Sequence, residues 1–438
     1  MSAPGRPHNS IARVALTAAA GTTIEYYDFF VYGTAAALVF PKLFFSPGLS
    51  PFVAQIAAFS TFTVGFLARP LGGTIFGHFG DLYGRKKALV AALLIMGCAT
   101  TLIGFLPTYA VVGDLAPLLL ISLRFVQGLA LGGQWGGAAL IAIENAPKNL
   151  RGYYGSFAQI GVSPGLMAAN VVFLIMGAFL SPSEFASWGW RVPFLCSVLL
   201  IGVGIYVQLR LEETAEFSGK AVAESEAAEK RRPRSPVVEA ILHHPRHILL
   251  AAGIYIANNI CFYVAITYAL AYGTSILHIP KSVMLSAVMI GAVVMVPALI
   301  ISGYLSDKLG RLRVFMAGAV LSAVWTLWFF PLLETRTPII IICDLALGFV
   351  PLSMMYGPQA ALFAELFPVE VRYSGASLGY QIGAVCGAGL APLIATMLYE
   401  EFKTTTPIGF YMLAACVVSF LCAFVLSRGR RQVWSGGP

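Results

Sequence analysis

Two carboxylates lie in the middle of an apolar stretch near the N-terminus, in the segment GTTIEYYDFFVYG at residues 21–33. Glu25 and Asp28 are three residues apart, and Tyr32 follows Asp28 by four, so the three side chains can share one face of a helix. An unpaired charge is costly in a soluble core, whereas an ionisable group inside a membrane segment usually marks a substrate or proton pathway. We therefore expect these acids to carry a proton or to face a buried cation.

Arg124 is the cation that we expect opposite these acids. It opens a second apolar stretch, RFVQGLALGGQWGGA at residues 124–138, and shares a helical face with Gln127. We predict that Arg124 points into a central cavity and that Glu25, Asp28 or both face it. A substrate carboxylate would then compete for Arg124, and the displaced acid would take up a proton because its counter-charge is gone.

A fixed ion pair is the alternative for these residues. In that case the pair ties the segment that holds Glu25 and Asp28 to the segment that holds Arg124, and Asp28 caps a neighbouring helix. The two interpretations diverge under Glu25→Gln and Asp28→Asn. Only proton coupling predicts that one variant loses proton-driven accumulation and keeps substrate exchange.

Further polar side chains interrupt the apolar stretches. Asn258 and Asn259 are adjacent amides, and at least one must face protein or water, either to bind substrate or to bond a neighbouring helix. Asp344 is the next candidate for proton coupling if the acids of the first span have no such role. The predicted set of substrate- or proton-binding residues is Glu25, Asp28, Tyr32, Arg124, Gln127, Asn258, Asn259, Tyr263 and Asp344.

The composition places these residues in a membrane protein. The chain has 438 residues, 58% of them hydrophobic and 11% charged, against about a quarter charged in soluble domains. Its mean hydropathy is +0.80. A membrane helix needs about 20 apolar residues. The predicted spans are 12–40, 52–76, 88–108, 115–143, 153–180, 190–210, 247–277, 282–305, 314–333, 337–364, 374–399 and 406–427.

The positions of Lys and Arg predict the orientation. Counted from a cytoplasmic N-terminus, most of them fall in segments on the cytoplasmic side, and Arg69 and Arg124 lie within the apolar spans. We expect an integral protein of the plasma (cytoplasmic) membrane with both termini in the cytoplasm. The net charge of +8 then reflects membrane topology, and we expect no nucleic-acid partner.

Two signatures occur twice in the chain. GHFGDLYGRKK at residues 77–87 returns as GYLSDKLGRLR at 303–313, and ENAPKNLR at 144–151 returns as ELFPVEVR at 365–372. The two repeats have nearly the same period, which indicates a duplicated six-span unit. We expect the shared charges to form an ion-pair latch at the cytoplasmic face. The predicted gate residues are Gly77, Asp81, Gly84, Arg85, Glu144, Arg151, Asp307, Arg311, Glu365 and Arg372.

The duplication predicts the domain organisation. Two halves of six spans describe a transporter whose substrate site lies between the halves. The domains are an N-terminal bundle at 1–217, a charged cytoplasmic linker at 218–245 and a C-terminal bundle at 246–438. Glycines repeat at every fourth position in the fourth and eleventh spans, which predicts close helix packing. They are Gly128, Gly132, Gly136, Gly375, Gly379, Gly383 and Gly387.

The repeated motif G-x-x-x-D-x-x-G-R-[RK] resembles the signature of the major facilitator superfamily. Within it, the chain is similar to the metabolite:proton symporter family of proline/betaine, α-ketoglutarate, citrate and shikimate carriers. The similarity extends through the two stretches quoted above and through ARPLGG (68–73), WGWRVPF (188–194) and RLEETAEF (210–217). It implies an all-α membrane protein of twelve transmembrane helices in two pseudo-symmetric six-helix bundles.

The expected function is secondary active transport. We predict proton-coupled symport, in the direction of uptake, of a small organic carboxylate or zwitterionic metabolite by alternating access, and no enzymatic activity. The partners would be the metabolite, the proton and the lipid bilayer, with no cofactor other than the coupling proton and no metal. A proton-driven drug or metabolite exporter is the alternative. Such exporters resemble one another in a Gly-Pro pair in the fifth span, whereas in GVSPG at residues 161–165 the proline precedes the glycine, so the match is poor. A non-transporting receptor on the same fold is the other alternative.

Overall fold

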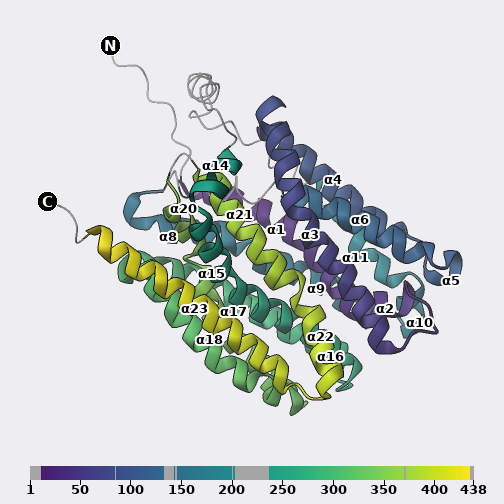
Figure 1. Cartoon of the computed structure of the whole chain (residues 1–438). Coiled ribbons are helices and arrows are strands. Elements are labelled where there is room, and N and C mark those ends of the chain that lie inside the picture. Colours follow the sequence, from purple (N-terminus) through teal and green to yellow (C-terminus); the bar gives the residue numbers. More distant parts are fainter. Residues whose placement is uncertain are drawn as a thin grey trace.

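The computed structural model describes residues 11–83, 85–132, 143, 146–199, 201–202, 236–368 and 371–434. Within this part, every regular element is a helix (Figure 1). The helices of the first half are α1 (Ile11–Leu38), α2 (Phe40–Leu43), α3 (Pro51–Tyr83), α4 (Arg85–Phe105), α5 (Tyr109–Val112), α6 (Leu115–Gly132), η1 (Lys148–Leu150), α8 (Arg151–Ile160), α9 (Val162–Phe179), α10 (Pro182–Ser187), η2 (Gly189–Arg191) and α11 (Val192–Leu195). Those of the second half are α14 (Pro236–His243), α15 (Pro245–Tyr263), η4 (Val264–Tyr268), α16 (Ala269–Ser275), α17 (Lys281–Leu309), α18 (Arg311–Glu334), α19 (Pro338–Tyr356), α20 (Gln359–Leu366), α21 (Arg372–Ala384), η5 (Val385–Gly389), α22 (Ala391–Phe402) and α23 (Thr406–Trp434).

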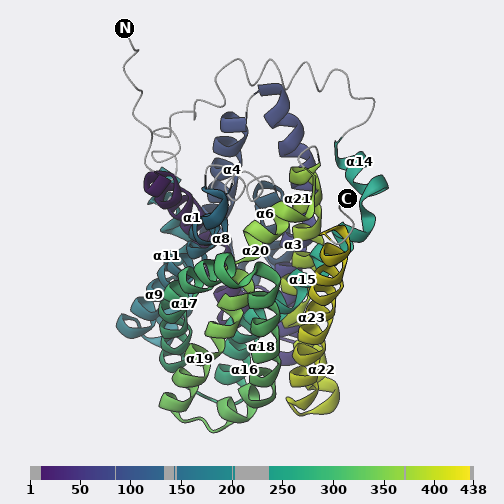
Figure 2. The same cartoon turned by 90° about the vertical axis from the view of Figure 1, so that its left-hand side faces the viewer.

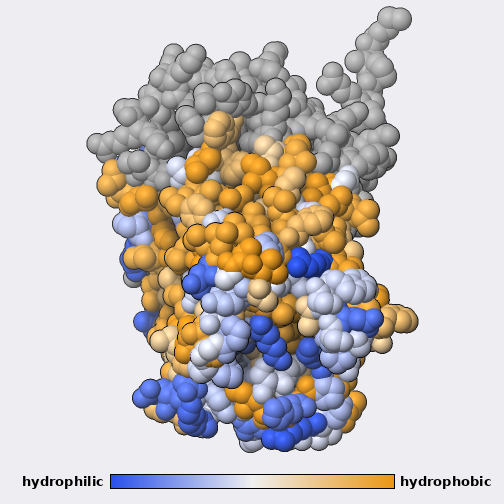
Figure 3. Space-filling view, turned by 90° about the vertical axis from the view of Figure 1, so that its right-hand side faces the viewer, coloured by the Kyte–Doolittle hydropathy of each residue, from blue (hydrophilic) through white to orange (hydrophobic). Residues whose placement is uncertain are grey.

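The helices are long and apolar enough to cross a bilayer. Nine helical segments in the described part meet both criteria, and Val90–Phe105 is a shorter apolar helix. The 29 residues of α17 extend about 44 Å at 1.5 Å per residue, which matches a bilayer with its head groups. Figure 3 shows a broad apolar band over one face of the molecule, with hydrophilic side chains gathered towards one end.

The helices pack as two bundles that meet along a central interface. In the first bundle α3 runs along α6 and α1 along α9, while in the second α17 runs along α19 and α18 along α23. The bundles touch where α8 and α9 lie against α17, and where α3 lies against η5 and α22 (Figure 1). The interface therefore brings the first, second and fifth spans against the seventh, eighth and eleventh.

Most of each copy of the repeated motif is helical, although the predicted spans end before the motif begins or early in it. Helix α3 continues to Tyr83 and α17 to Leu309, beyond the span ends predicted at residues 76 and 305, so that each motif aspartate belongs to the last helical turn. The chain then reverses at Gly310, whose φ of 97° is a conformation that glycine adopts without steric cost. We call the end of the bundle that holds this turn the motif end, and the opposite end the far end. The start of α1 and the end of α23 also lie at the motif end (Figure 2).

The predicted linker is in part helical. Its residues 218–235 lie outside the described part, as do residues 203–210 of the predicted sixth span. The remainder of the linker forms α14, which packs against α15 and α21. The C-terminal bundle thus begins with a short helix at the motif end before α15 enters the membrane.

Glycines bring the backbones of α3 and α6 into contact. A Cβ atom at Gly128 would collide with the carbonyl of Gly65, and one at Gly132 with the carbonyl of Arg69. Small residues at every fourth position allow this approach. The close contact places Arg69 of α3 and Arg124 of α6 in one buried layer of the first bundle.

The predicted glycine face of the eleventh span also packs closely. Cβ atoms at Gly379, Gly383 and Gly387 would press against Ala251, Tyr255 and Asn259 of α15, respectively. This contact lies within the second bundle, and that of α3 with α6 lies within the first. They fix the bundles internally, which leaves the bundle interface as the place for movement.

Residues of the WGWRVPF motif close the far end of the first bundle. Trp190 is fully buried and packs edge-on against Phe44. Arg191 donates from Nη1 to the carbonyls of Gly104 and Leu106, at 2.8 and 2.7 Å. These carbonyls end α4, so the arginine satisfies acceptors that a helix terminus leaves open. The motif therefore stabilises the fold at the far end of the first bundle, away from the cavity described below.

Candidate functional site

The two acids of α1 face different surroundings. Glu25 is partly buried, and its charged neighbour is the guanidinium of Arg69, without an ion pair between them in the described part. Asp28 is 2% exposed, and neither of its carboxylate oxygens has a hydrogen-bond partner among the described residues. The hydroxyl groups of Thr100 and Ser197 lie beside it. Asp28 is therefore a buried acid in a pocket of neutral polar groups.

Arg124 is buried among aromatic rings. Its Cζ lies 4.5 Å from the ring centroid of Phe29, 4.1 Å from that of Tyr32 and 5.0 Å from that of Phe62. It donates from Nη1 to Oε1 of Gln127 at 3.1 Å, while Nε and Nη2 have no partner among the described residues. Stacking on ring faces offsets part of the cost of burying the charge. Two donor groups remain free to bind an anion.

In this conformation no ion pair joins Arg124 to an acid of α1 among the described residues. Arg124 approaches Asp28 through neutral groups: Gln127 donates from Nε2 to Oγ1 of Thr100 at 2.7 Å, and Thr100 lies beside Asp28. The ring of Phe29 occupies the space next to the guanidinium. Helical periodicity predicts which residues share a face, but not which bulky side chain separates two neighbouring helices.

Arg69 is the functional candidate that the sequence analysis missed. Its Cζ lies 4.7 Å from the ring centroid of Phe29 and 4.4 Å from that of Phe66. The ring of Phe29 thus lies near two guanidinium groups, those of Arg69 and Arg124. The signal was present, because Arg69 is a charge inside a predicted span.

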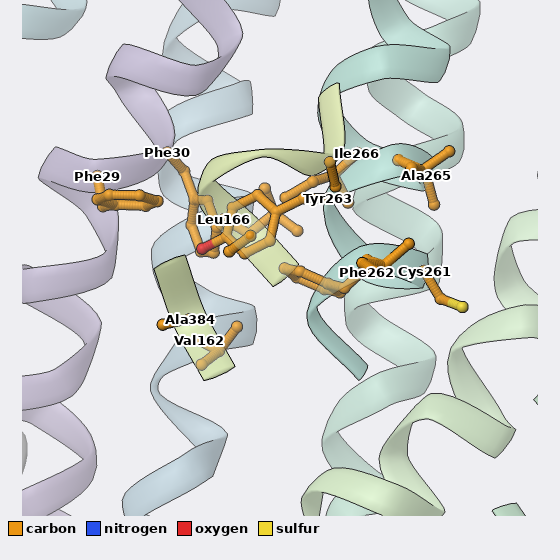
Figure 4. Packing of buried hydrophobic residues seen from close by; sticks show 14 of the residues in the cluster. Phe29, Phe30, Val162, Leu166, Cys261, Phe262, Tyr263, Ala265, Ile266 and Ala384 are labelled. Atoms are coloured by element: carbon orange, nitrogen blue, oxygen red, sulfur yellow. The ribbon is translucent and has the colours of Figure 1, made fainter. Parts of the chain in front are cut away.

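A small cavity lies between the two bundles. Its volume is about 20 Å³, which is room for about one water molecule. Figure 4 shows how Phe29 and Phe30 of α1 approach Phe262 and Tyr263 of α15 in this region. The lining includes three predicted residues, Asn258, Asn259 and Tyr263, and does not include Arg124. The lining residues are Tyr26, Val162, Tyr255, Asn258, Asn259, Phe262, Tyr263, Met295 and Tyr356.

Tyrosines from three spans join their hydroxyl groups beside this cavity. Tyr26 Oη lies 3.2 Å from Tyr356 Oη and 3.2 Å from Tyr380 Oη. The ring of Tyr255 stacks on that of Tyr380, with centroids 4.3 Å apart. Asn258 contributes an Oδ1 atom that is buried and has no partner among the described residues. The site therefore offers hydroxyl and amide groups that can donate to or accept from a polar cargo.

The bundles are closed against each other at the motif end. Asp307 of α17 accepts from the backbone N–H groups of Gly152 and Tyr153, both at 2.8 Å, in the first turn of α8. A carboxylate is favourable at a helix N-terminus because the N–H groups and the helix dipole point towards it. Arg311 pairs with Glu365 at 2.7 Å and with Asp307 at 3.7 Å. The bonds of Asp307 to α8 join the second bundle to the first, while Arg311 and Glu365 pair beside them within the second bundle.

The bundles also touch in the middle of the membrane and towards the far end. Thr63 of α3 donates from Oγ1 to the carbonyl of Gly389, the last residue of the π-helical turn η5, at 2.6 Å. A Cβ atom at Gly33 of α1 would lie 3.6 Å from Oγ1 of Thr267 in η4. The bundles therefore touch at several levels, and the cavity between them has room for little more than one water molecule.

The remaining predicted residues lie apart from the cavity or outside the described part. Trp325 donates from Nε1 to Oδ1 of Asp344 at 2.9 Å, between α18 and α19. Tyr32 donates from Oη to Oγ1 of Thr61 at 2.6 Å. Arg151 and Arg372 are the first residues of α8 and α21. The predicted gate positions whose side chains lie outside the described part are Gly77, Asp81, Gly84, Arg85 and Glu144.

The chain belongs to the Major Facilitator Superfamily, whose family model matches residues 18–379 and 288–437. It is therefore a membrane transporter with the twelve-helix fold of that superfamily, and not an enzyme. Solved structures share the fold: the proton:xylose symporter XylE has a TM-score of 0.75 at 16% identity, with 96% of each chain covered.

Relatives of higher identity are metabolite carriers. The inner membrane metabolite transport protein YhjE of Escherichia coli K12 is 40% identical over 434 residues, which cover 97% of this chain and 96% of that protein. The shikimate transporter of the same organism is 38% identical, with 96% and 95% covered. Its proline/betaine transporter is 33% identical, with 97% and 85% covered.

Proposed function

We propose that the protein is a proton-coupled symporter that takes up a small organic carboxylate or zwitterion. The observation that carries this proposal is the arrangement around Phe29. Two buried guanidiniums, of Arg69 and Arg124, lie near its ring, and two acids, Glu25 and Asp28, lie on the same helix as Phe29. Buried charges inside a membrane are costly unless they serve a pathway or are paired.

The arrangement supports coupling by competition. A cargo carboxylate that reaches Arg69 would replace Glu25 as its counter-charge, since a bidentate arginine–carboxylate contact is stronger than the present long-range attraction. Glu25 would then bind a proton because its stabilising cation is engaged elsewhere. Arg124 and Asp28 offer a second version of the same exchange, transmitted through Gln127 and Thr100. Either route moves one proton with one carboxylate.

The cavity supports a cargo with hydroxyl or amine groups next to the carboxylate. Two of its rings are already stacked, Tyr26 on Phe30 and Tyr255 on Tyr380. Their edges and hydroxyl groups are therefore more accessible to a cargo than their faces. We infer that a hydroxylated carboxylate binds better than a quaternary ammonium compound, which needs open aromatic faces. A thermal-shift comparison of shikimate, citrate, 2-oxoglutarate, proline and betaine tests this inference.

We also propose that the motif end is cytoplasmic, with both termini on that side of the plasma membrane. The excess of Lys and Arg in the segments at this end supports the orientation. The contact of Asp307 with α8, supported by the Arg311–Glu365 pair beside it, would then form the inner gate, closed while the cargo enters from outside. Breaking them would open the site to the cytoplasm.

The test is transport in proteoliposomes under an imposed pH gradient. Uptake and counterflow of a cargo identified by thermal shift are measured for the unmodified protein, Glu25→Gln and Asp28→Asn. We expect one variant to lose accumulation along the pH gradient while it keeps counterflow exchange. Asp114→Asn, an exposed acid at the far end, is the matched control and should behave as the unmodified protein. Accumulation by both site variants would overturn the coupling role of these acids.

A further inference from the structure

The surface around α14 combines exposed apolar and cationic side chains. Ile241 is 49% exposed, Leu242 is 56% exposed and, just inside α15, Leu249 is 65% exposed. His243 and Arg246 are exposed beside them. We call this set of five residues the linker surface. Transport as proposed above makes no use of it.

The length of α15 places the linker surface at the level of lipid head groups. The helical segment from Pro245 to Ser275 has 31 residues, which is about 46 Å at 1.5 Å per residue. The hydrocarbon core of a bilayer is about 30 Å thick. The first turns of α15 therefore extend beyond the hydrocarbon at the motif end. Helix α14 is held at the same level because it packs on α15 and α21 (Figure 2).

The linker surface carries one permanent cation, Arg246. Arg246 has no ion pair in this part of the chain. The rings of His244 and His247 lie 6.0 Å apart next to it. Glu239 is the acid of α14, and its backbone carbonyl lies 3.2 Å from Nδ1 of His243. A phosphate group therefore has an accessible cation at this position.

We propose that the linker surface binds an anionic phospholipid of the leaflet at the motif end. The phosphate would lie at Arg246, and the acyl chains would cover Leu242 and Leu249. An apolar face next to basic residues is the pattern by which short helices bind at a membrane interface. The proposal commits to a lipid because exposed leucines of α14 and of the first turns of α15 lie beside an exposed arginine, and acyl chains can cover the former while a phosphate binds the latter. It does not depend on the identity of the cargo or on coupling.

The affinity test is a lipid titration followed by native mass spectrometry. The detergent-purified full chain is titrated with phosphatidylglycerol and, separately, with phosphatidylcholine. We expect preferential retention of phosphatidylglycerol, and a reduction of about fivefold in its affinity for Arg246→Gln, as expected for one cation near a charged surface. Arg428→Gln removes an exposed arginine that stacks on Phe424 of α23, and should leave the affinity unchanged. Equal retention of the two lipids, or equal loss in both variants, would overturn the proposal.

Hydrogen exchange in nanodiscs locates the lipid. Phosphatidylglycerol should protect the amides of residues 239–249 relative to phosphatidylcholine, and Leu242→Gln should weaken that protection. Inorganic phosphate added to phosphatidylcholine nanodiscs should not restore it, since a free anion lacks the acyl chains. Protection by phosphate alone, or protection confined to other parts of the chain, would contradict a lipid site here. Variants with an unchanged melting temperature and elution volume are used, so that unfolding does not mimic the result.

Discussion

The two bundles share a fold and a repeated motif, yet they contribute different chemistry to the centre of the molecule. The first bundle supplies charge, and the second supplies neutral hydroxyl and amide groups. The charged residues are Glu25, Asp28, Arg69 and Arg124, and the neutral ones are Tyr255, Asn258, Asn259, Tyr356 and Tyr380. A cargo that touches both sets must bridge the bundles. Duplication has therefore kept the framework symmetric while the site became asymmetric.

At the motif end the described contacts show the opposite division. Here the second bundle supplies the charged side chains, Asp307, Arg311 and Glu365, while the first supplies backbone N–H groups of α8. Among the described side chains, the charges of the centre therefore come mainly from the first bundle and those of the gate contacts from the second. If this comparison is sound, substitutions in the two bundles should affect binding, coupling and gating in different ways.

The largest effect is expected for Arg69→Gln. The variant loses a charged hydrogen-bond donor to the cargo and leaves Glu25 without its cation, and each effect costs about 1.5–3 kcal/mol. Uptake in proteoliposomes should fall by at least about 100-fold. Arg428→Gln is the control for loss of an arginine at the periphery. Uptake within threefold of the unmodified protein would show that the first bundle does not hold the anion.

The next largest effect is expected for Asp307→Asn. The amide keeps one acceptor but loses the charge that the helix terminus favours, so the closed inner gate loses about 1.5 kcal/mol. The transport rate should fall about tenfold, while cargo affinity measured by thermal shift should stay within twofold. Asp114→Asn is the matched acid-to-amide control. A change in affinity as large as the change in rate would place Asp307 in the site instead of the gate.

A smaller effect is expected for Tyr356→Phe. The change removes one hydroxyl group from the cluster with Tyr26, and a neutral hydrogen bond contributes about 0.5–1.5 kcal/mol. Cargo affinity should weaken about fivefold, with accumulation along a pH gradient retained. Tyr109→Phe, in α5 outside the cavity lining, serves as the control. Loss of accumulation at saturating cargo would assign a coupling role to the second bundle.

The smallest effect is expected for Asp344→Asn. Asparagine can still accept from the Trp325 indole, which preserves the contact between α18 and α19. Because this hydrogen bond is kept, the accumulation ratio should change by less than about twofold, which is at the low end of what a neutral hydrogen bond contributes. The measurement is accumulation at steady state under a fixed pH gradient. Abolished accumulation would break the comparison, because a coupling acid would then lie in the second bundle.

The sequence predicts the framework of this molecule well. Apolar runs predict the spans, since a bilayer imposes their length, and glycines at every fourth position predict that α6 packs closely on another helix, which is α3 in the structure. The repeated motif predicts where charges gather at the bundle interface. Each of these signals is local in sequence or repeats along it. The exception is the motif turn, where the helices continue through Asp81 and Asp307.

The site itself is less predictable because its contacts depend on helix rotation and on bulky neighbours. The ring of Phe29 lies next to both arginines, and no pattern in the sequence announces it. The tyrosine cluster draws Tyr26, Tyr356 and Tyr380 from three distant spans. Arg69 carried the same signal as Arg124, a charge inside an apolar run, and was given no role.

The main-chain donors opposite Asp307 have an evolutionary consequence. Because Gly152 and Tyr153 contribute N–H groups, most side chains at position 153 would leave the bond intact, so the bond itself tolerates mutational drift there. Proline is the exception, since it has no N–H group. Position 152 is restricted for another reason, because a Cβ atom there would press on the carbonyl of Gly303. Selection on this hydrogen-bonded contact therefore acts on the aspartate and the glycines, while the side chain at position 153 is constrained by its ring contacts with Phe157 and Tyr304 instead.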